Sequence, residues 1–222
     1  MQHNEKEVSY NAINTYTVKN NHSNSTKNIW VACHGLGYLS RFFANYFKSL
    51  NPQENYIIVP QAPSKYYQGQ DFKHVGASWL TRENTLLETQ NVLSYLNAVS
   101  QEENLLQNTK KLIVFGFSQG VSVALRWVAH SQINCNAIVI HSGRIPNELC
   151  AEDFSFLDTR TKVYLLYGTK DEYITEQRIN EEREKAETLF GERLKIISFD
   201  GSHIVNTGLL LNISEELNQS NE

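Results

Sequence analysis

The sequence has few cysteines, few prolines, no excess of basic residues and no long apolar run. Its 222 residues include three cysteines and four prolines. Cys33, Cys135 and Cys150 form no C-x-x-C pair, and no cluster of cysteine and histidine has the spacing of a zinc site. The phosphate-binding pattern G-x-x-x-x-G-K-S/T is also missing. We therefore expect no metal, no cofactor and no disulfide framework, but reduced thiols as in a cytoplasm.

The charge balance and the hydropathy argue against two further classes of protein. Asp and Glu number 24 against 20 Lys and Arg, so the net charge is −4 and no nucleic acid partner is expected. The mean hydropathy is −0.43, and no apolar run approaches the roughly 18 residues of a spanning helix, so we expect no stable membrane insertion. The start, MQHNEKEVSY, lacks the basic and apolar parts of a signal peptide. These features predict a cytoplasmic protein.

Short apolar runs alternate with amphipathic segments along a chain that has the length and composition of one domain, residues 1–222. We expect buried strands at six runs rich in β-branched or aromatic residues: 29–33, 56–59, 112–115, 137–140, 163–167 and 194–197. We expect helices in five longer segments: 40–50, 81–99, 121–129, 175–190 and 209–217. This alternation predicts an α/β fold with a mostly parallel central sheet and helices on both faces.

The beginning of the chain predicts one additional strand. Mostly apolar side chains fall on alternate positions from Val8 to Val18, and the polar segment 20–27 that follows predicts a hairpin loop. We therefore expect this strand to form an antiparallel edge of the sheet.

A glycine–serine turn stands where a predicted strand meets a predicted helix. Residues 116–120, Gly-Phe-Ser-Gln-Gly, have the pattern G-x-S-x-G. In that arrangement a sharp turn projects the serine hydroxyl beyond the sheet, and the glycines remove side chains where strand and helix approach each other. We therefore predict that Ser118 is the nucleophile of an acyl transfer.

A nucleophilic serine needs a histidine as general base and a carboxylate that orients the histidine. His203 lies well after Ser118 and just beyond the last predicted strand, so it is the predicted base. Asp171 follows the preceding predicted strand and is the predicted acid, because the order in such folds is serine, acid, histidine. Glu172 and Asp200 are weaker rivals: Glu172 starts from a position that points elsewhere, and Asp200 suits the cap of a turn.

The oxyanion that develops during acyl transfer needs backbone N–H donors. One donor is expected from Gln119, directly after the nucleophile. The other is expected from Leu36, because residues 34–37, His-Gly-Leu-Gly, follow an early strand and their glycines let the backbone turn toward the site. We expect His34 to be a hydrogen-bonded structural residue of this loop rather than a second base.

These motifs resemble the α/β-hydrolase superfamily, and more narrowly its small carboxylesterase/phospholipase group, which includes acyl-protein thioesterases. The matches are HGLG, GFSQG, Ser-Gly, GTKDEYI and GSH, at 34–37, 116–120, 142–143, 168–174 and 201–203. They span nearly the whole chain in the family's order. The resemblance implies a serine hydrolase for carboxylic esters or thioesters without a cofactor, and 222 residues leave no room for a large cap domain.

The chain departs from the better-known members of that group at three places. Tyr38 replaces an acidic residue, residues 79–81 read Trp-Leu-Thr instead of Trp-Phe-Asp, and residues 174–175 read Ile-Thr instead of Val-Pro. The segment 65–79 is similar to a sub-branch of predicted bacterial esterases. These departures leave the three predicted catalytic residues intact but argue against a protein-depalmitoylating role.

Aromatic side chains near the expected mouth of the site are candidates for substrate binding. The predicted substrate-binding residues are Tyr38, Tyr66, Tyr67, Phe72 and Trp79. The alternative for the segment 61–80 is a loop that anchors its own aromatic side chains in the core.

Three functions fit the sequence. The first is a carboxylesterase for short to medium acyl esters, the second a lysophospholipase or acyl-thioesterase with a long apolar channel, and the third a non-catalytic binding protein on a hydrolase scaffold. The expected partner is a small-molecule ester, and a homodimer is compatible with the sequence.

Overall fold

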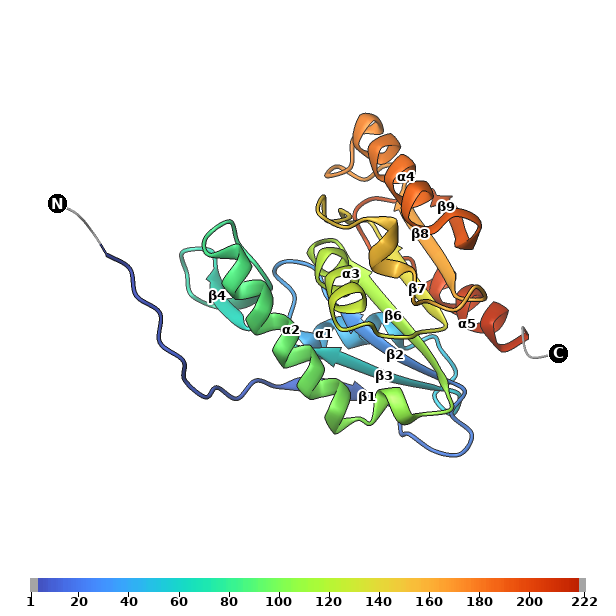
Figure 1. Ribbon diagram of the computed structural model, residues 1–222, viewed down its shortest axis with the longest axis horizontal. Coiled ribbons are helices and arrows are strands. Elements are labelled where there is room, and N and C mark those ends of the chain that lie inside the picture. Colours follow the sequence, from blue (N-terminus) through green and yellow to red (C-terminus); the bar gives the residue numbers. More distant parts are fainter. Residues whose placement is uncertain (1–3, 220–222) are drawn as a thin grey trace.

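A seven-stranded sheet forms the centre of the computed structural model, which describes residues 4–219 (Figure 1). The strands lie side by side in the order β1 (Tyr16–Lys19), β3 (Asn55–Pro60), β2 (Asn28–Cys33), β6 (Lys111–Phe117), β7 (Ala137–His141), β8 (Lys162–Gly168) and β9 (Leu194–Phe199). Neighbours from β3 to β9 are parallel, and β1 is antiparallel to β3. All six predicted strands and the mostly parallel sheet are confirmed, but β9 is an edge strand and none of its residues is buried.

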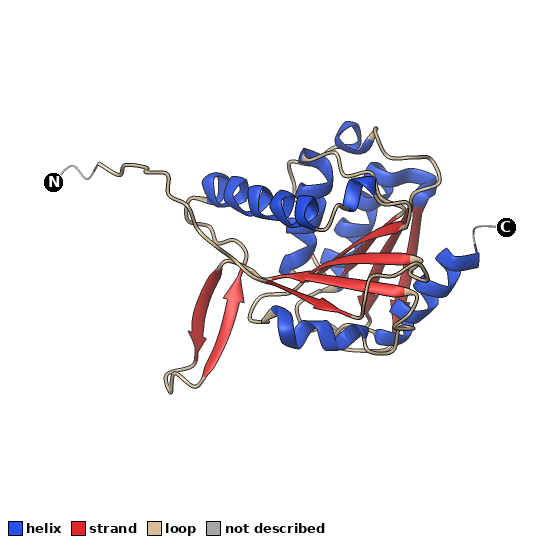
Figure 2. Ribbon diagram, turned by 90° about the horizontal axis from the view of Figure 1, so that it is seen from below, coloured by secondary structure: helices blue, strands red, loops and turns tan. Residues whose placement is uncertain are grey.

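Helices cover both faces of this sheet, as predicted (Figures 1 and 2). The α-helices are α1 (Ser40–Phe43), α2 (Thr85–Glu102), α3 (Gln119–His130), α4 (Glu176–Phe190) and α5 (Thr207–Gln219). Short 3₁₀ segments lie at Ala44–Phe47, Leu105–Gln107, Ala151–Phe154 and Gly191–Arg193. Helices α2, α3 and α4 contribute to one apolar cluster, and α1 and α5 to the other.

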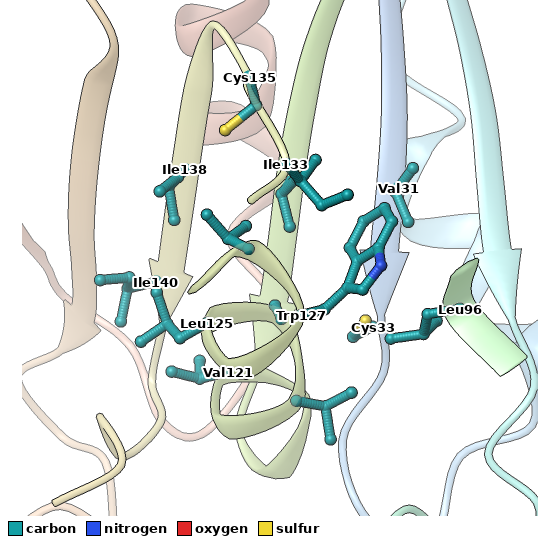
Figure 3. Packing of buried hydrophobic residues seen from close by; sticks show 14 of the residues in the cluster. Val31, Cys33, Leu96, Val121, Leu125, Trp127, Ile133, Cys135, Ile138 and Ile140 are labelled. Carbon is teal, nitrogen blue, oxygen red and sulfur yellow. The ribbon is translucent and has the colours of Figure 1, made fainter. Parts of the chain in front are cut away.

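The alternation of side chains along each strand explains the two apolar clusters. Val31 and Cys33 of β2 face the α2–α3–α4 side, whereas Trp30 and Ala32 face the α1–α5 side. Trp127 of α3 packs over the first of these faces beside β2 and β6 (Figure 3). Because both faces are covered, the inner strands are apolar at successive positions, which is the pattern that predicted them.

The predicted first strand is shorter than expected and lies beside a different neighbour. β1 covers only Tyr16–Lys19 and pairs with β3, so it forms an antiparallel edge but no hairpin with β2. The physical reason is that β2 already has parallel partners on both sides, β3 and β6, which leaves β3 as the open edge. Val8 and Tyr10 are exposed on an extended segment that leads away from the body (Figure 2), so their alternation reflects no buried face.

Residues 64–78, for which the sequence predicts no strand, form a separate two-stranded antiparallel hairpin. β4 (Ser64–Gln68) pairs with β5 (His74–Ser78), and the hairpin extends from the body of the molecule (Figure 2). Every residue of β4 is exposed. A strand that is exposed on both faces has no apolar alternation, which is why the sequence pattern did not predict it.

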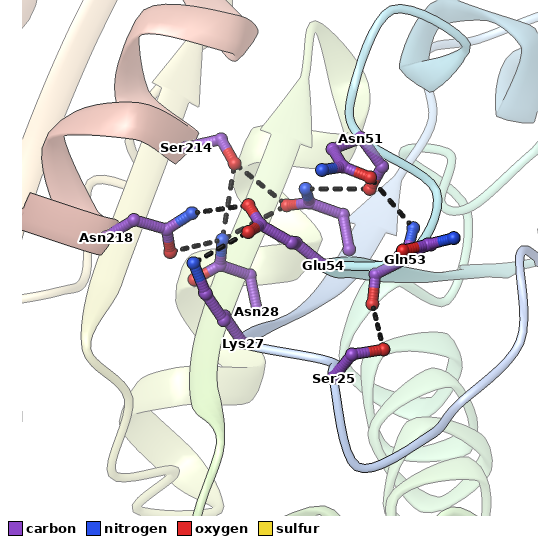
Figure 4. A network of polar contacts seen from close by, with 9 residues as sticks. Ser25, Lys27, Asn28, Asn51, Gln53, Glu54, Ser214 and Asn218 are labelled. Carbon is purple, nitrogen blue, oxygen red and sulfur yellow. Dashed lines mark hydrogen bonds and ion pairs between the residues drawn. The ribbon is translucent and has the colours of Figure 1, made fainter.

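A buried polar network joins the start of the sheet to α5 (Figure 4). The side-chain oxygen Oδ1 of Asn55 accepts hydrogen bonds from Trp30 Nε1 at 2.9 Å, Asn28 Nδ2 at 3.1 Å and Ser214 Oγ at 2.9 Å. Asn218 accepts a further bond from Asn28 at 3.0 Å. One acceptor thus satisfies donors from β2 and α5, which buried polar groups require.

Replacing the central acceptor should destabilise the fold. We expect Asn55→Leu to lower the free energy of unfolding by about 3 kcal/mol, because it leaves the Trp30 indole N–H buried without an acceptor. Asn218→Ala, at the partly exposed rim of the network, should cost less than about 1 kcal/mol. Urea unfolding of both variants measures the difference, and equal losses would contradict the central role of Asn55.

Candidate active site

The turn between β6 and α3 holds Ser118 in a strained backbone conformation. Its φ is 54° and its ψ is −120°, a region that residues other than glycine rarely adopt. A Cβ at position 120 would lie 2.1 Å from the backbone oxygen of Cys33, and one at position 116 would lie 2.5 Å from Cα of Val121. Glycine at both positions therefore lets β2, β6 and α3 meet around the serine.

His203 and Asp171 come together beyond the ends of β9 and β8. His203 Nδ1 lies 2.7 Å from Asp171 Oδ2, and the aspartate side chain is completely buried. The second carboxylate oxygen, Oδ1, accepts a hydrogen bond from the backbone N–H of Tyr173 at 2.9 Å. An imidazole that donates from Nδ1 to this carboxylate keeps Nε2 available as a proton acceptor.

Aromatic rings fix the orientation of the His203 imidazole. Its ring centroid lies 4.9 Å from that of Phe117 and 4.8 Å from that of Tyr173. Ser118 and His203 line the same cleft, although no hydrogen bond joins their side chains in the described part of the chain.

The two rival carboxylates make other contacts. Glu172 Oε2 accepts a hydrogen bond from the backbone N–H of His203 at 3.3 Å, and Asp200 Oδ1 lies 2.6 Å from Lys170 Nζ. Neither bonds the imidazole ring, which leaves Asp171 as its carboxylate partner among residues 4–219.

The backbone N–H groups of Leu36 and Gln119 have no acceptor within the described residues, and both residues line the cleft with Ser118. The next amide along, that of Gly37, donates to Ala77 O at 2.8 Å. The Gln119 side chain accepts from the Trp79 backbone N–H at 2.9 Å and donates to Leu80 O at 2.7 Å. These bonds fix both turns and leave the two amides free to donate.

His34 is a structural residue of its loop, as expected. Its Nε2 accepts from the Ala62 backbone N–H at 3.1 Å, and its Nδ1 then donates to Gly35 O at 2.8 Å. Burial lowers the pKa of His34 to about 4. The neutral ring thereby holds the Leu36 turn in place.

The structure contradicts the predicted substrate contact of Trp79. It is completely buried, and its indole Nε1 donates to His34 O at 2.8 Å. Large aromatic side chains with a polar atom take this position when a buried carbonyl needs a donor. Trp79 therefore anchors the loop in the core, as the alternative interpretation had it.

The other predicted substrate contacts also lie outside the cleft, whose volume is about 640 Å³. Tyr38 is half-buried and its hydroxyl is 2.9 Å from that of Tyr46. Tyr66, Tyr67 and Phe72 are exposed on the β4–β5 hairpin. The hairpin lies against the loop that carries Leu36, because Gln68 Nε2 donates to Gly37 O at 2.9 Å and the Gly37 N–H donates to Ala77 O. None of the three side chains lines the cleft.

His141, at the end of β7, is a site residue that sequence reasoning missed. It is buried, its Nε2 accepts from the Asn206 backbone N–H at 3.0 Å, and its Nδ1 lies 3.1 Å from Ser142 Oγ. Burial, with a smaller effect of neighbouring His203, lowers the pKa of His141 to about 3. The ring therefore holds the segment that follows His203. The sequence feature that could have indicated its role is its position at the end of a predicted strand, directly before Ser142-Gly143.

No group of three or more His, Cys, Asp and Glu side chains within residues 4–219 is arranged to hold a metal ion. In the same part of the chain, no helix combines the length and the apolar character needed to cross a membrane.

The fold and the cleft define a class of protein. A mostly parallel sheet that carries a serine on a strained strand–helix turn, with an aspartate–histidine pair after the next strands, is that of an α/β hydrolase. The family model described as phospholipase/carboxylesterase matches residues 14–220, and the chain belongs to that hydrolase family.

Solved structures of similar fold agree with this membership. Zea mays acyl-protein thioesterase 2 is 19% identical, with a TM-score of 0.67 over 93% of this chain and 99% of that one. Esterase PE8 is 20% identical, with a TM-score of 0.68 over 93% and 98%. The Bacillus cereus carboxylesterase is 15% identical, with a TM-score of 0.64 over 95% and 96%. A search of the curated proteins finds no match.

The two buried histidines should make the fold sensitive to acid. Burial lowers the pKa from the ordinary value of 6.5 to about 4 in His34 and to about 3 in His141. As the pH falls, these histidines are therefore protonated in the unfolded chain before they are protonated in the folded chain. Their contribution to stability is complete above pH 6.5 and is lost as the pH falls toward 4 and 3. Each should cost about 2 kcal/mol of unfolding free energy between pH 7 and pH 5.

Urea unfolding at pH 7 and pH 5 measures this loss. His141→Gln should reduce the pH-dependent part by about 2 kcal/mol, whereas His130→Gln, which changes an exposed histidine, should leave it unchanged. An unaltered pH dependence in His141→Gln would show that this histidine is not held neutral.

Proposed function

We propose that this hydrolase is a serine carboxylesterase that cleaves short to medium acyl esters. Ser118 is the nucleophile, His203 the general base and Asp171 the residue that orients His203. The observation that carries the proposal is the 2.7 Å bond between His203 and Asp171 at the cleft that Ser118 lines. A buried carboxylate on Nδ1 stabilises the imidazolium that forms when Nε2 accepts the serine proton.

The reaction proceeds through an acyl-enzyme. Ser118 Oγ attacks the ester carbonyl while His203 Nε2 takes its proton, and the N–H groups of Leu36 and Gln119 stabilise the oxyanion. The tetrahedral intermediate expels the alcohol, which receives the proton from His203. Water then attacks the acyl carbonyl while His203 Nε2 takes a proton from it. The second tetrahedral intermediate releases the carboxylic acid, and the proton returns from His203 to Ser118 Oγ.

The lining of the cleft favours short acyl groups. Ser122 and Arg126 are four residues apart on α3, so they share one face of that helix, and Ser118 directly precedes its first residue. Arg126 lies about 10 Å along the axis from the start of α3, and it pairs with Glu148, which also lines the cleft. A long acyl chain along this wall would meet charged groups, which oppose its burial.

Removal of each proposed catalytic side chain should abolish or strongly reduce turnover. We expect Ser118→Ala and His203→Ala to lower kcat by about 10⁴-fold or more, and Asp171→Asn by about 10²- to 10⁴-fold. Asp200→Asn changes an exposed carboxylate that pairs with Lys170 and should stay within about twofold of the wild type. Unchanged turnover in Asp171→Asn would refute the acid assignment.

Hydrolysis of 4-nitrophenyl esters from acetyl to palmitoyl tests the chain-length preference. We expect kcat/KM to be highest for short acyl groups and to fall by about 100-fold toward palmitoyl, because the added methylenes of a long chain would have to pack against the charged Arg126–Glu148 pair. A maximum at long chains would favour the lysophospholipase or acyl-thioesterase alternative, and matched thioesters would separate these two. Absence of both turnover and organophosphonate labelling of Ser118 would favour a non-catalytic binding protein.

A further inference from the structure

The cleft is rich in arginine although the whole chain is acidic. Arg126, Arg144 and Arg178 line it, and Glu148 is the only carboxylate among its described lining residues. The three arginines come from α3, from the loop after β7 and from the first turn of α4. Three separate elements thus bring guanidinium groups to one cavity with Ser118 and His203.

Arg126 is neutralised by Glu148. Its Nε and Nη2 both lie 2.7 Å from Glu148 Oε1, and its side chain is only 16% exposed. This pair ties α3 to the loop after β7 and leaves little positive charge for a substrate.

Arg144 is only weakly paired. Its Nε lies 3.8 Å from Glu182 Oε1, and its side chain is 60% exposed. The other oxygen of Glu182 accepts from the Ile145 backbone N–H at 2.8 Å, which positions the loop. The Arg144 amino groups make no hydrogen bond with the described residues, so they are available to a ligand.

Arg178 has no carboxylate partner within 4 Å among residues 4–219. Its Nη1 donates to Tyr173 O at 3.1 Å, and the Tyr173 ring packs against the His203 imidazole at 4.8 Å. Arg178 is therefore linked through one residue to the base of the proposed reaction, and the rest of its planar donor group is unused.

Neighbouring charges reinforce this excess of positive charge. Lys185 donates to Ile145 O and to Asn147 Oδ1 on the same loop. The Asp171 side chain is buried against His203, and Glu172 accepts a hydrogen bond from the His203 backbone N–H. Neither carboxylate lines the cleft. The four cations around the loop exceed the two carboxylates by two charges. The cations are Arg126, Arg144, Arg178 and Lys185, and the carboxylates are those of Glu148 and Glu182.

We propose that the substrate ester carries an anionic group, a carboxylate or a phosphate, that binds to Arg144 and Arg178. This inference rests on the proposed esterase function and narrows its substrate class. Guanidinium groups bind such anions through paired, charge-assisted hydrogen bonds. A cleft lined by one sign of charge also raises the local concentration of an oppositely charged substrate.

Matched esters test the proposal and distinguish the two anions. One pair is the 4-nitrophenyl hemiester of adipic acid and its neutral methyl ester, corrected for spontaneous cleavage. The other is butyryl glycerol phosphate and butyryl glycerol. In wild-type protein, the anionic member of at least one pair should have a kcat/KM about tenfold higher, mainly through KM, and the difference should shrink as salt rises from 50 to 500 mM.

Arginine variants assign the effect to the cleft. Arg144→Gln and Arg178→Gln should each lower kcat/KM for the preferred anionic ester by about tenfold and leave its neutral partner within about twofold. Arg160→Gln removes the same charge from an exposed position beside the start of β8 and should change neither. A variant that lowers both esters equally would indicate a structural role and overturn the proposal.

Two further measurements separate this proposal from the proposed function. If neutral esters are hydrolysed and Ser118 is labelled, but no anionic ester is preferred, the anion site is refuted and the esterase stands. If no ester is cleaved and Ser118 is not labelled, the esterase fails, and calorimetric titration with adipate and glycerol phosphate decides the anion site. Binding that is weakened at least tenfold in Arg178→Gln supports the site, and absence of binding overturns it.

Discussion

The close approach of the start of α3 to the end of β2 at Gly120 is the constraint on which the site depends. Any side chain there would overlap the carbonyl of Cys33, so only glycine lets α3 begin against the end of β2. This contact brings the loop that carries Leu36 beside the turn that carries Ser118. The packing of β2, β6 and α3 therefore positions both the proposed nucleophile and the two proposed oxyanion donors.

The parallel part of the fold could be predicted because burial on both faces has a simple consequence in the sequence. Strands such as β2 and β6 carry no polar side chain after their first residue, and such runs stand out between turn residues. Elements at the surface carry no such signal. The alternation from Val8 to Val18 is mostly exposed, β4 is exposed at every residue, and β5 is buried only at its last three residues.

Much of the candidate site could likewise be predicted, because chemistry restricts which residues can follow which strands. Ser118, Asp171 and His203 each come directly after a strand of a parallel sheet, and the carboxyl ends of such strands share one edge. The position of Trp79 was harder to predict, because an aromatic residue near a strand end is equally typical of a binding pocket and of a buried core. Its burial is decided by the acceptor that His34 O supplies, a contact between segments far apart in the sequence.

The arginines could not be assigned from sequence, because a charged residue on a helix usually faces solvent. Whether an arginine can bind a ligand depends on which carboxylates lie near its guanidinium group, and the fold determines those neighbours. Arg126 meets Glu148, whereas Arg178 meets a backbone carbonyl. Within a Debye length of about 8 Å such local pairing outweighs the net charge of −4. The same loop that Glu182 and Lys185 hold in place thus determines both the shape of the cleft and the sign of its charge.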